Sequence, residues 1–323
     1  MTDLFRPTGR KNARTAGVLA LVMSLLLLAG CATTPQLSPA TRQALPTRAT
    51  VGDVPFHGQR DYQCGPAALA MVLEAAGRDT AVDALIPQVF LPGRDGSVQP
   101  EMLATVRRHG LIPFRLETGF PGLLDELAAG RPVVVMQNLS LPIWPQWHYA
   151  VAIGYDLPAD DIVLHTGMTP ERSVDFGRFD ATWARSGRWA FVALPPGQLP
   201  VDEDVDANLR AITDFESVQG SAAALPAWRA LAQRHPDAAM VQFALGNARY
   251  ANGDAQGAKQ AFRAAVTAAP TLAPAWLNLG IVAGRTGDSD TARRALERAA
   301  ALPGPWQPRA REERKALAEE TDA

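Results

Sequence analysis

The sequence predicts an α+β domain followed by an all-α domain built of helical repeats. Residues 51–195 contain both strand-like and helix-like stretches, whereas residues 207–323 are helical with an alanine-rich period. A segment rich first in proline and then in acidic residues, 196–206, separates the two parts and is expected to be a linker. The composition fits folded domains, because 47% of the 323 residues are hydrophobic and 20% are charged.

The N-terminus has the pattern of a secretory signal peptide. Four basic residues precede an apolar run from Ala16 to Ala29, which is shorter than the ~20 residues that a membrane-spanning helix needs. The run ends in Leu-Ala-Gly-Cys at residues 28–31 and resembles the lipobox of bacterial lipoproteins. The resemblance implies removal of residues 1–30 and a lipid on the sulfur of Cys31. A plain signal peptide or anchor with an incidental cysteine is the alternative.

A lipid anchor would determine where the protein lies. Residues 31–50 comprise the cysteine that the resemblance implies is lipidated, followed by a segment rich in alanine, threonine and proline. This segment lacks an apolar period, so a flexible tether is expected. Ala32 stands where lipoproteins of the inner membrane usually have aspartate, so the resemblance implies the outer membrane of the bacterial envelope, facing the periplasm. The net charge is −2, and removal of residues 1–30 makes the chain more acidic. Nucleic acid is therefore not an expected partner.

The second cysteine, Cys64, has the setting of a reactive thiol. Two cysteines in the whole chain exclude disulfide-rich, zinc-thiolate and iron–sulfur scaffolds. Pro66 and Gly77 predict the ends of an almost wholly apolar helix, which should lie buried at the centre of the domain. Cys64 would stand at its N-terminus, where free backbone N–H groups and the helix dipole favour the thiolate. A buried, inert cysteine is the alternative.

Among the five histidines, His148 is the candidate base. It begins a strand pattern in which Ala150 and Ala152 share its face, and these small residues leave room for the central helix to pack there. Trp144 and Trp147 precede the histidine, and they either wall a substrate groove or cover the edge of the sheet.

These segments resemble the bacteriocin-processing peptidases, family 39 of the cysteine peptidases, and their papain-like relatives. The resemblance rests on Gln59, on Asp-Tyr-Gln-Cys-Gly-Pro-Ala-Ala at residues 61–68 and on His148 followed by an apolar strand, and it covers residues 51–195. It implies a papain-like fold, with a central helix packed on an antiparallel sheet. It also implies that Cys64 is the nucleophile, His148 the base and Gln59 the donor to the oxyanion.

The residue that orients the histidine departs from the family pattern. The family places Asp or Asn about 16 residues after the histidine, where this sequence has Leu-His-Thr-Gly at residues 164–167. Two candidates are His165, at the family position, and Asn138, which a hairpin through residues 139–147 would bring beside His148. A backbone acceptor is the third possibility.

The C-terminal part repeats with a period of 34 residues. Gly246 recurs as Gly280 and Ala258 as Ala292. Such a period is typical of helix–turn–helix repeats, and the pattern resembles the tetratricopeptide repeat. An ordinary helical bundle is the alternative. By analogy with such solenoids, the repeats are expected to bind a protein partner.

The function expected from these features is that of a lipid-anchored periplasmic cysteine peptidase. It would hydrolyse peptide or protein substrates, and its repeats would recruit a substrate or a partner. One alternative is a catalytically inactive, peptidase-like scaffold for envelope assembly, and another is an acyltransferase or amidase that uses the same Cys–His pair. No cofactor or metal is expected, because the sequence lacks a His-Glu-x-x-His pattern, a phosphate loop and a dinucleotide fingerprint.

Overall fold

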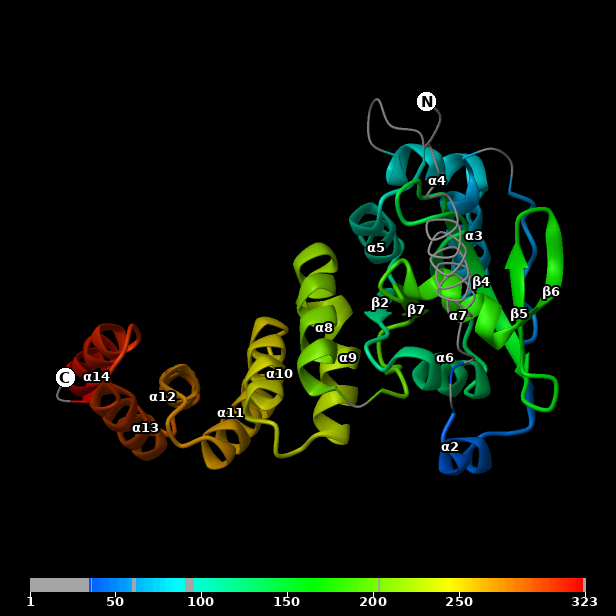
Figure 1. Ribbon diagram of the computed structural model, residues 1–323. Coiled ribbons are helices and arrows are strands. Elements are labelled where there is room, and N and C mark those ends of the chain that lie inside the picture. The colour runs from blue at the N-terminus through cyan, green and yellow to red at the C-terminus, as the bar shows by residue number, and fades with distance from the viewer. Residues whose placement is uncertain (1–34, 36, 60–61, 91–95, 203, 322–323) are drawn as a thin grey trace, which may run out of the picture.

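The computed structural model describes residues 35, 37–59, 62–90, 96–202 and 204–321. The expected signal peptide and Cys31 lie outside these residues. In the described part of the chain, no helix is both long enough and apolar enough to cross a membrane. The described residues form an α+β domain and a helical array that extends away from one edge of its sheet (Figure 1).

An antiparallel sheet forms the centre of the N-terminal domain (Figure 1). Its strands are β1 (Arg48–Thr50), β2 (Ile112–Arg115), β3 (Val133–Asn138), β4 (Trp147–Asp156), β5 (Asp161–Thr166), β6 (Thr169–Asp175) and β7 (Ala190–Leu194). They lie in the order β2-β7-β3-β4-β5-β6, and β1 pairs with the C-terminal end of β4. Strand β3 is buried along its whole length because helices cover both faces of the sheet.

Five helices cover the sheet. One face carries α3 (Cys64–Ala75), α4 (Val82–Val89) and α5 (Gln99–Arg108), and the other carries α6 (Gly119–Ala128) and α7 (Phe176–Ala184). Every residue from Gly65 to Leu73 is buried. The central apolar helix expected from the sequence is therefore confirmed, as is the α+β fold class.

The central helix packs on the face of β4 opposite to the one expected. The sequence predicts packing against the face that holds His148 and Ala150. Instead, Tyr149 and Val151 pack with α3 in one apolar cluster, while Ala150 packs with the leucines of α6 in another. The small residues of β4 therefore make room for the large side chains of α6, and the expectation about this face is wrong.

The tether expected over residues 31–50 is ordered in its second half. Helix α2 (Pro39–Ala44) precedes β1, and both Leu37 and Leu45 are buried in the core of the domain. Arg42 forms an ion pair of 2.6 Å with Asp160, beside the end of β4. The expectation of a flexible chain up to residue 50 is thus wrong, because two leucines and one strand pairing hold this segment against the sheet.

Seven helices follow the sheet domain. They are α8 (Val205–Gln219), α9 (Ser221–Arg234), α10 (Ala239–Ala251), α11 (Ala255–Ala268), α12 (Ala273–Arg285), α13 (Ser289–Ala301) and α14 (Gln307–Thr321). The repeated glycines are required where helices cross: a Cβ at Gly246 would lie 2.5 Å from the ring of Phe262, and one at Gly280 would lie 2.6 Å from Leu296. This close packing explains the 34-residue period, and it confirms the helical repeats.

The array is joined to the sheet domain through a common core. Ile212 and Phe215 of α8 belong to the same apolar cluster as Phe114 of the edge strand β2. At the rim of this contact, Arg107 of α5 forms an ion pair of 2.7 Å with Asp214. Helix α8 thus covers an edge of the sheet that would otherwise be open to pairing.

Candidate functional site

A cavity of about 700 Å³ lies where the N-terminus of α3 meets the beginning of β4. It brings together the three residues that the sequence singles out: Cys64, His148 and Gln59. The other lining residues are Tyr62, Gly96, Ser97, Pro145, Gln146, Trp147, Tyr149 and Gly167. The cavity therefore combines a thiol, an imidazole, an amide and several aromatic side chains.

Cys64 is the first residue of α3, and its side chain is partly buried. Burial raises the pKa of the Cys64 thiol, while the backbone N–H groups of Tyr149, Gly65 and Cys64 itself, which donate to the sulfur, lower it. Burial is the larger effect, so the protonated thiol is favoured at rest. The expectation that the helix N-terminus stabilises a resting thiolate is not met in these surroundings.

His148 is held by a hydroxyl group. Its Nε2 lies 2.7 Å from Oγ1 of Thr166, at the end of the neighbouring strand β5. Burial, followed by the positive charge of Arg172, lowers the pKa of His148. Among the described residues no hydrogen bond joins Cys64 to His148. Because burial favours the uncharged form of each group, the pair at rest is a neutral thiol and a neutral imidazole in one cavity.

Neither residue proposed as the orienting partner contacts His148. His165 points away: its Nε2 donates to the carbonyl of Val54 at 3.2 Å, and its Nδ1 accepts from the backbone N–H of Glu171. Asn138 is buried, and its Oδ1 accepts from the backbone N–H groups of Ser140 and Gln146. Both assignments are therefore wrong for this structure.

Thr166 occupies the orienting position instead. It lies within the segment that aligns with the family position, one residue after His165, and successive residues of a strand point to opposite faces. The family pattern directs attention to a carboxylate or an amide, so the hydroxyl was missed. The strand parity of residues 164–166 is the signal that could have found it.

Gln59 is locked beside the nucleophile. Its Nε2 donates to the carbonyl of Tyr149 at 3.1 Å, and its Oε1 accepts from the N–H of Gly167 at 2.9 Å. The backbone N–H of Gln59 also donates to the carbonyl of Gly167. The amide has a second N–H that makes no hydrogen bond with the described residues, and a donor of this kind can serve a developing oxyanion.

Ser97 supplies a second hydroxyl at the cavity that the sequence analysis does not predict. Oγ of Ser97 is buried without a hydrogen-bond partner in the described structure. It packs against Gly65, where a Cβ would lie only 2.0 Å from Oγ. The glycine that follows Cys64 is therefore required by this close approach.

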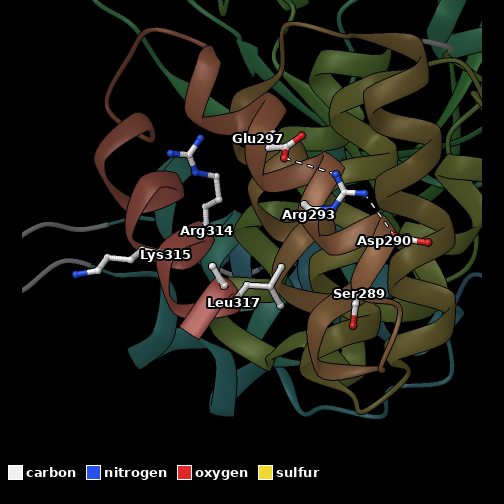
Figure 2. Close-up of a pocket in the computed structure, with 8 residues that line it drawn as sticks. Ser289, Asp290, Arg293, Glu297, Arg314, Lys315 and Leu317 are labelled. Atoms are coloured by element: carbon white, nitrogen blue, oxygen red, sulfur yellow. Dashed lines mark hydrogen bonds and ion pairs between the residues drawn. The ribbon is translucent and has the colours of Figure 1, made fainter. Parts of the chain in front are cut away.

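A second cavity, of about 610 Å³, lies between α13 and α14 at the far end of the array (Figure 2). Its walls are largely charged, and Arg293 pairs with Asp290 and Glu297 of its own helix. Cysteine and histidine are absent from its lining. Within the described residues, no group of three or more His, Cys, Asp or Glu side chains could hold a metal ion.

The sheet, the central helix and the cavity with Cys64 and His148 define the class of papain-like α+β domains. Residues 51–191 match the model of the Peptidase_C39 like family, and residues 209–273 match that of the Tetratricopeptide repeat. The chain thus carries a C39-like peptidase domain followed by tetratricopeptide repeats.

Several solved structures are similar to less than half of the chain. A C39-like peptidase from Bacillus anthracis is 17% identical, with a TM-score of 0.39, over 46% of this chain and 98% of that chain. The type III secretion translocator chaperone SycD of Yersinia enterocolitica is 14% identical, with a TM-score of 0.36, over 38% and 90% of the two chains. MamA is 21% identical, with a TM-score of 0.35, over 37% and 70%. No curated protein matches the chain.

Proposed function

We propose that the protein is a cysteine peptidase that hydrolyses peptide bonds at Cys64. The observation that carries this proposal is the single cavity that holds Cys64, His148 and Gln59 within a C39-like peptidase domain. The thiol provides a nucleophile, the imidazole a base, and the amide a donor for the oxyanion.

The neutral resting pair sets the order of events. As the sulfur of Cys64 attacks the peptide carbonyl, His148 takes the thiol proton, and the oxyanion accepts from Gln59 and from the N–H of Cys64. His148 then returns the proton to the leaving amine, which leaves a thioester on Cys64. A water molecule, deprotonated by His148, attacks the thioester and releases the acid and the free thiol.

The location and the partner of the enzyme belong to the same proposal. A lipid on Cys31 would hold the protein at the outer membrane, facing the periplasm, and the repeats would bind a protein partner. The lipobox supports the anchor, and the tetratricopeptide match supports the partner. Metabolic labelling with palmitate tests the anchor: the label should disappear in Cys31→Ala, and a label that persists would refute it.

The rate at which iodoacetamide alkylates Cys64, measured by peptide mass spectrometry, tests whether His148 acts as the base for this thiol. Near neutral pH, His148→Ala should slow alkylation about tenfold, because the base is lost, whereas His109→Ala, outside the cavity, should not. In the unaltered protein the rate should rise as the pH approaches the raised pKa of the thiol, because the thiolate reacts. Cleavage of a peptide mixture should require both Cys64 and His148.

The competing function is that of a peptide-binding scaffold without turnover. The absence of a described Cys64–His148 hydrogen bond and the raised pKa of the thiol favour it. Alkylation that is insensitive to His148→Ala, together with no cleavage of any peptide, would establish the scaffold. An acyltransferase or amidase would instead release a product other than a shortened peptide, which mass spectrometry of the products distinguishes.

A further inference from the structure

Residues 139–147, here called the apolar loop, carry an unusual concentration of exposed apolar side chains. The loop joins β3 to β4, includes Trp147 as the first residue of β4, and contains no charged residue. Five of its nine side chains are large, apolar and exposed, and Ile143 and Trp144 reach 77% and 78% exposure. The other three are Leu139, Leu141 and Trp147. Large apolar side chains that are exposed close together in one loop indicate an interaction site.

The apolar loop is held in one conformation. Oδ1 of Asn138 accepts from the N–H groups of Ser140 and Gln146, which closes the base of the loop. Arg185 of the α7 C-cap donates to the carbonyls of Asn138 and Ser140, at 3.4 and 2.9 Å. A surface fixed before binding loses less conformational entropy when a ligand arrives. These polar contacts therefore preorganise the exposed apolar side chains.

The apolar loop runs directly into the cavity of Cys64. Its last three residues, Pro145 to Trp147, line the cavity, and His148 follows them. Tyr62, which is 62% exposed, also lines the cavity. A ligand that contacts the loop is therefore placed beside both the thiol and the imidazole.

The charge of the surface argues for a peptide rather than a bilayer as the occupant. Loops that bind anionic membranes usually carry basic residues, and this loop has none in a chain of net charge −2. Arg185, at its base, already bonds two carbonyls. We propose that the apolar loop is the substrate-recognition surface, which binds an apolar segment of a peptide next to the bond at Cys64. This inference rests on the proposed peptidase function and adds the class of substrate.

Equilibrium binding tests the inference without turnover. A fluorescent octapeptide rich in leucine and phenylalanine, and a second in which serine replaces both, are titrated into the Cys64→Ala protein. The first should bind at least about tenfold more tightly, and Trp144→Ala and Trp147→Ala should each weaken it severalfold. The matched control is Trp306→Ala, since this tryptophan of the helical array is also exposed (47%). In the unaltered protein the apolar peptide should slow alkylation of Cys64.

The outcomes separate the recognition surface from the chemistry. Equal affinity for the two peptides, or an equal loss in Trp306→Ala, would overturn the inference while leaving the His148 dependence of alkylation intact. Sedimentation with phosphatidylcholine vesicles that is lost in Trp144→Ala, without an effect on peptide binding, would assign the loop to a bilayer and also overturn it. If alkylation does not depend on His148 but the apolar peptide binds as expected, the proposed recognition surface is supported and the proposed peptidase activity is contradicted.

Discussion

The hydroxyl of Thr166 replaces a group that usually orients a catalytic histidine, and the replacement changes the electrostatics of the base. A carboxylate would favour the charged imidazolium, whereas a hydroxyl carries no charge and can either donate or accept. With Arg172 also acting on His148, the imidazole is favoured in its neutral form. The neutral resting pair thus follows first from the burial of Cys64 and His148, and neither the uncharged hydroxyl of Thr166 nor the positive charge of Arg172 opposes it.

Removal of this hydroxyl should weaken the base without removing it. In Thr166→Val, which keeps the shape of the side chain, alkylation of Cys64 near neutral pH should slow by about fivefold, less than in His148→Ala, because the ring is present but no longer held. Above the raised pKa of the thiol, the rates of Thr166→Val and the unaltered protein should converge, since the thiolate then forms without help. The measurement is the pH dependence of the alkylation rate.

Thr166→Ser is the matched control, because it restores a hydroxyl at the same backbone position. Its rate should return to within about twofold of the unaltered protein. If serine and valine slow the reaction equally at every pH, Thr166 acts through packing alone and does not position His148.

At the scale of single elements, the sequence predicts what is encoded locally. The apolarity of residues 65–73 is a local signal, and so is the 34-residue spacing of Gly246 and Gly280, and both predict helices that the structure contains. The choice of the face of β4 on which α3 packs is not encoded locally. It depends on which side of β4 the leucines of α6 occupy, and that is decided by the order of the strands.

The residues of the site also divide into those that a local sequence pattern predicts and one that it does not. Cys64, His148 and Gln59 belong to recognisable patterns, and the fold brings all three to one cavity. The identity of the orienting residue depends on strand register, because a shift of one position exchanges His165 for Thr166. Asn138 is near His148, since it pairs with the neighbouring Trp147. Its side-chain Oδ1, however, accepts a hydrogen bond from the N–H of Ser140 in the loop that follows.

At the scale of the molecule, the ordered segment from Leu37 onward changes the reach of the proposed anchor. Five residues separate Cys31 from Leu37, which allows at most about 20 Å. Helix α2 lies at the end of β4 opposite to the cavity (Figure 1). The ten residues of β4 span about 30 Å at the rise of an extended strand. Under the proposed lipid anchor, the sheet domain would therefore lie close to the bilayer with its cavity directed away from it.

The common core joins the first helices of the array to the sheet domain, whereas the outer helices pack in clusters of their own. Phe215 of α8 and Phe262 of α11 are each about 1% exposed, but they belong to different apolar clusters. Phe215 shares its cluster with β2 and with the face of the sheet that α6 and α7 cover, whereas the cluster of Phe262 lies within the repeats. This pair of matched phenylalanines can therefore show whether α8 supports the catalytic domain.

Truncation of each phenylalanine should have different consequences for the distant cavity. Either Phe→Ala change removes a fully buried ring and should cost about 3–5 kcal/mol of local stability. In Phe215→Ala, Cys64 should become accessible to alkylation at a lower urea concentration, because the lost contacts belong to the core that also supports the sheet. In Phe262→Ala, the urea dependence at Cys64 should stay unchanged while far-ultraviolet circular dichroism reports earlier loss of repeat helices. Equal exposure of Cys64 in both variants would contradict this division into two clusters, since the cluster of Phe262 would then support the cavity as strongly as the cluster of Phe215 does.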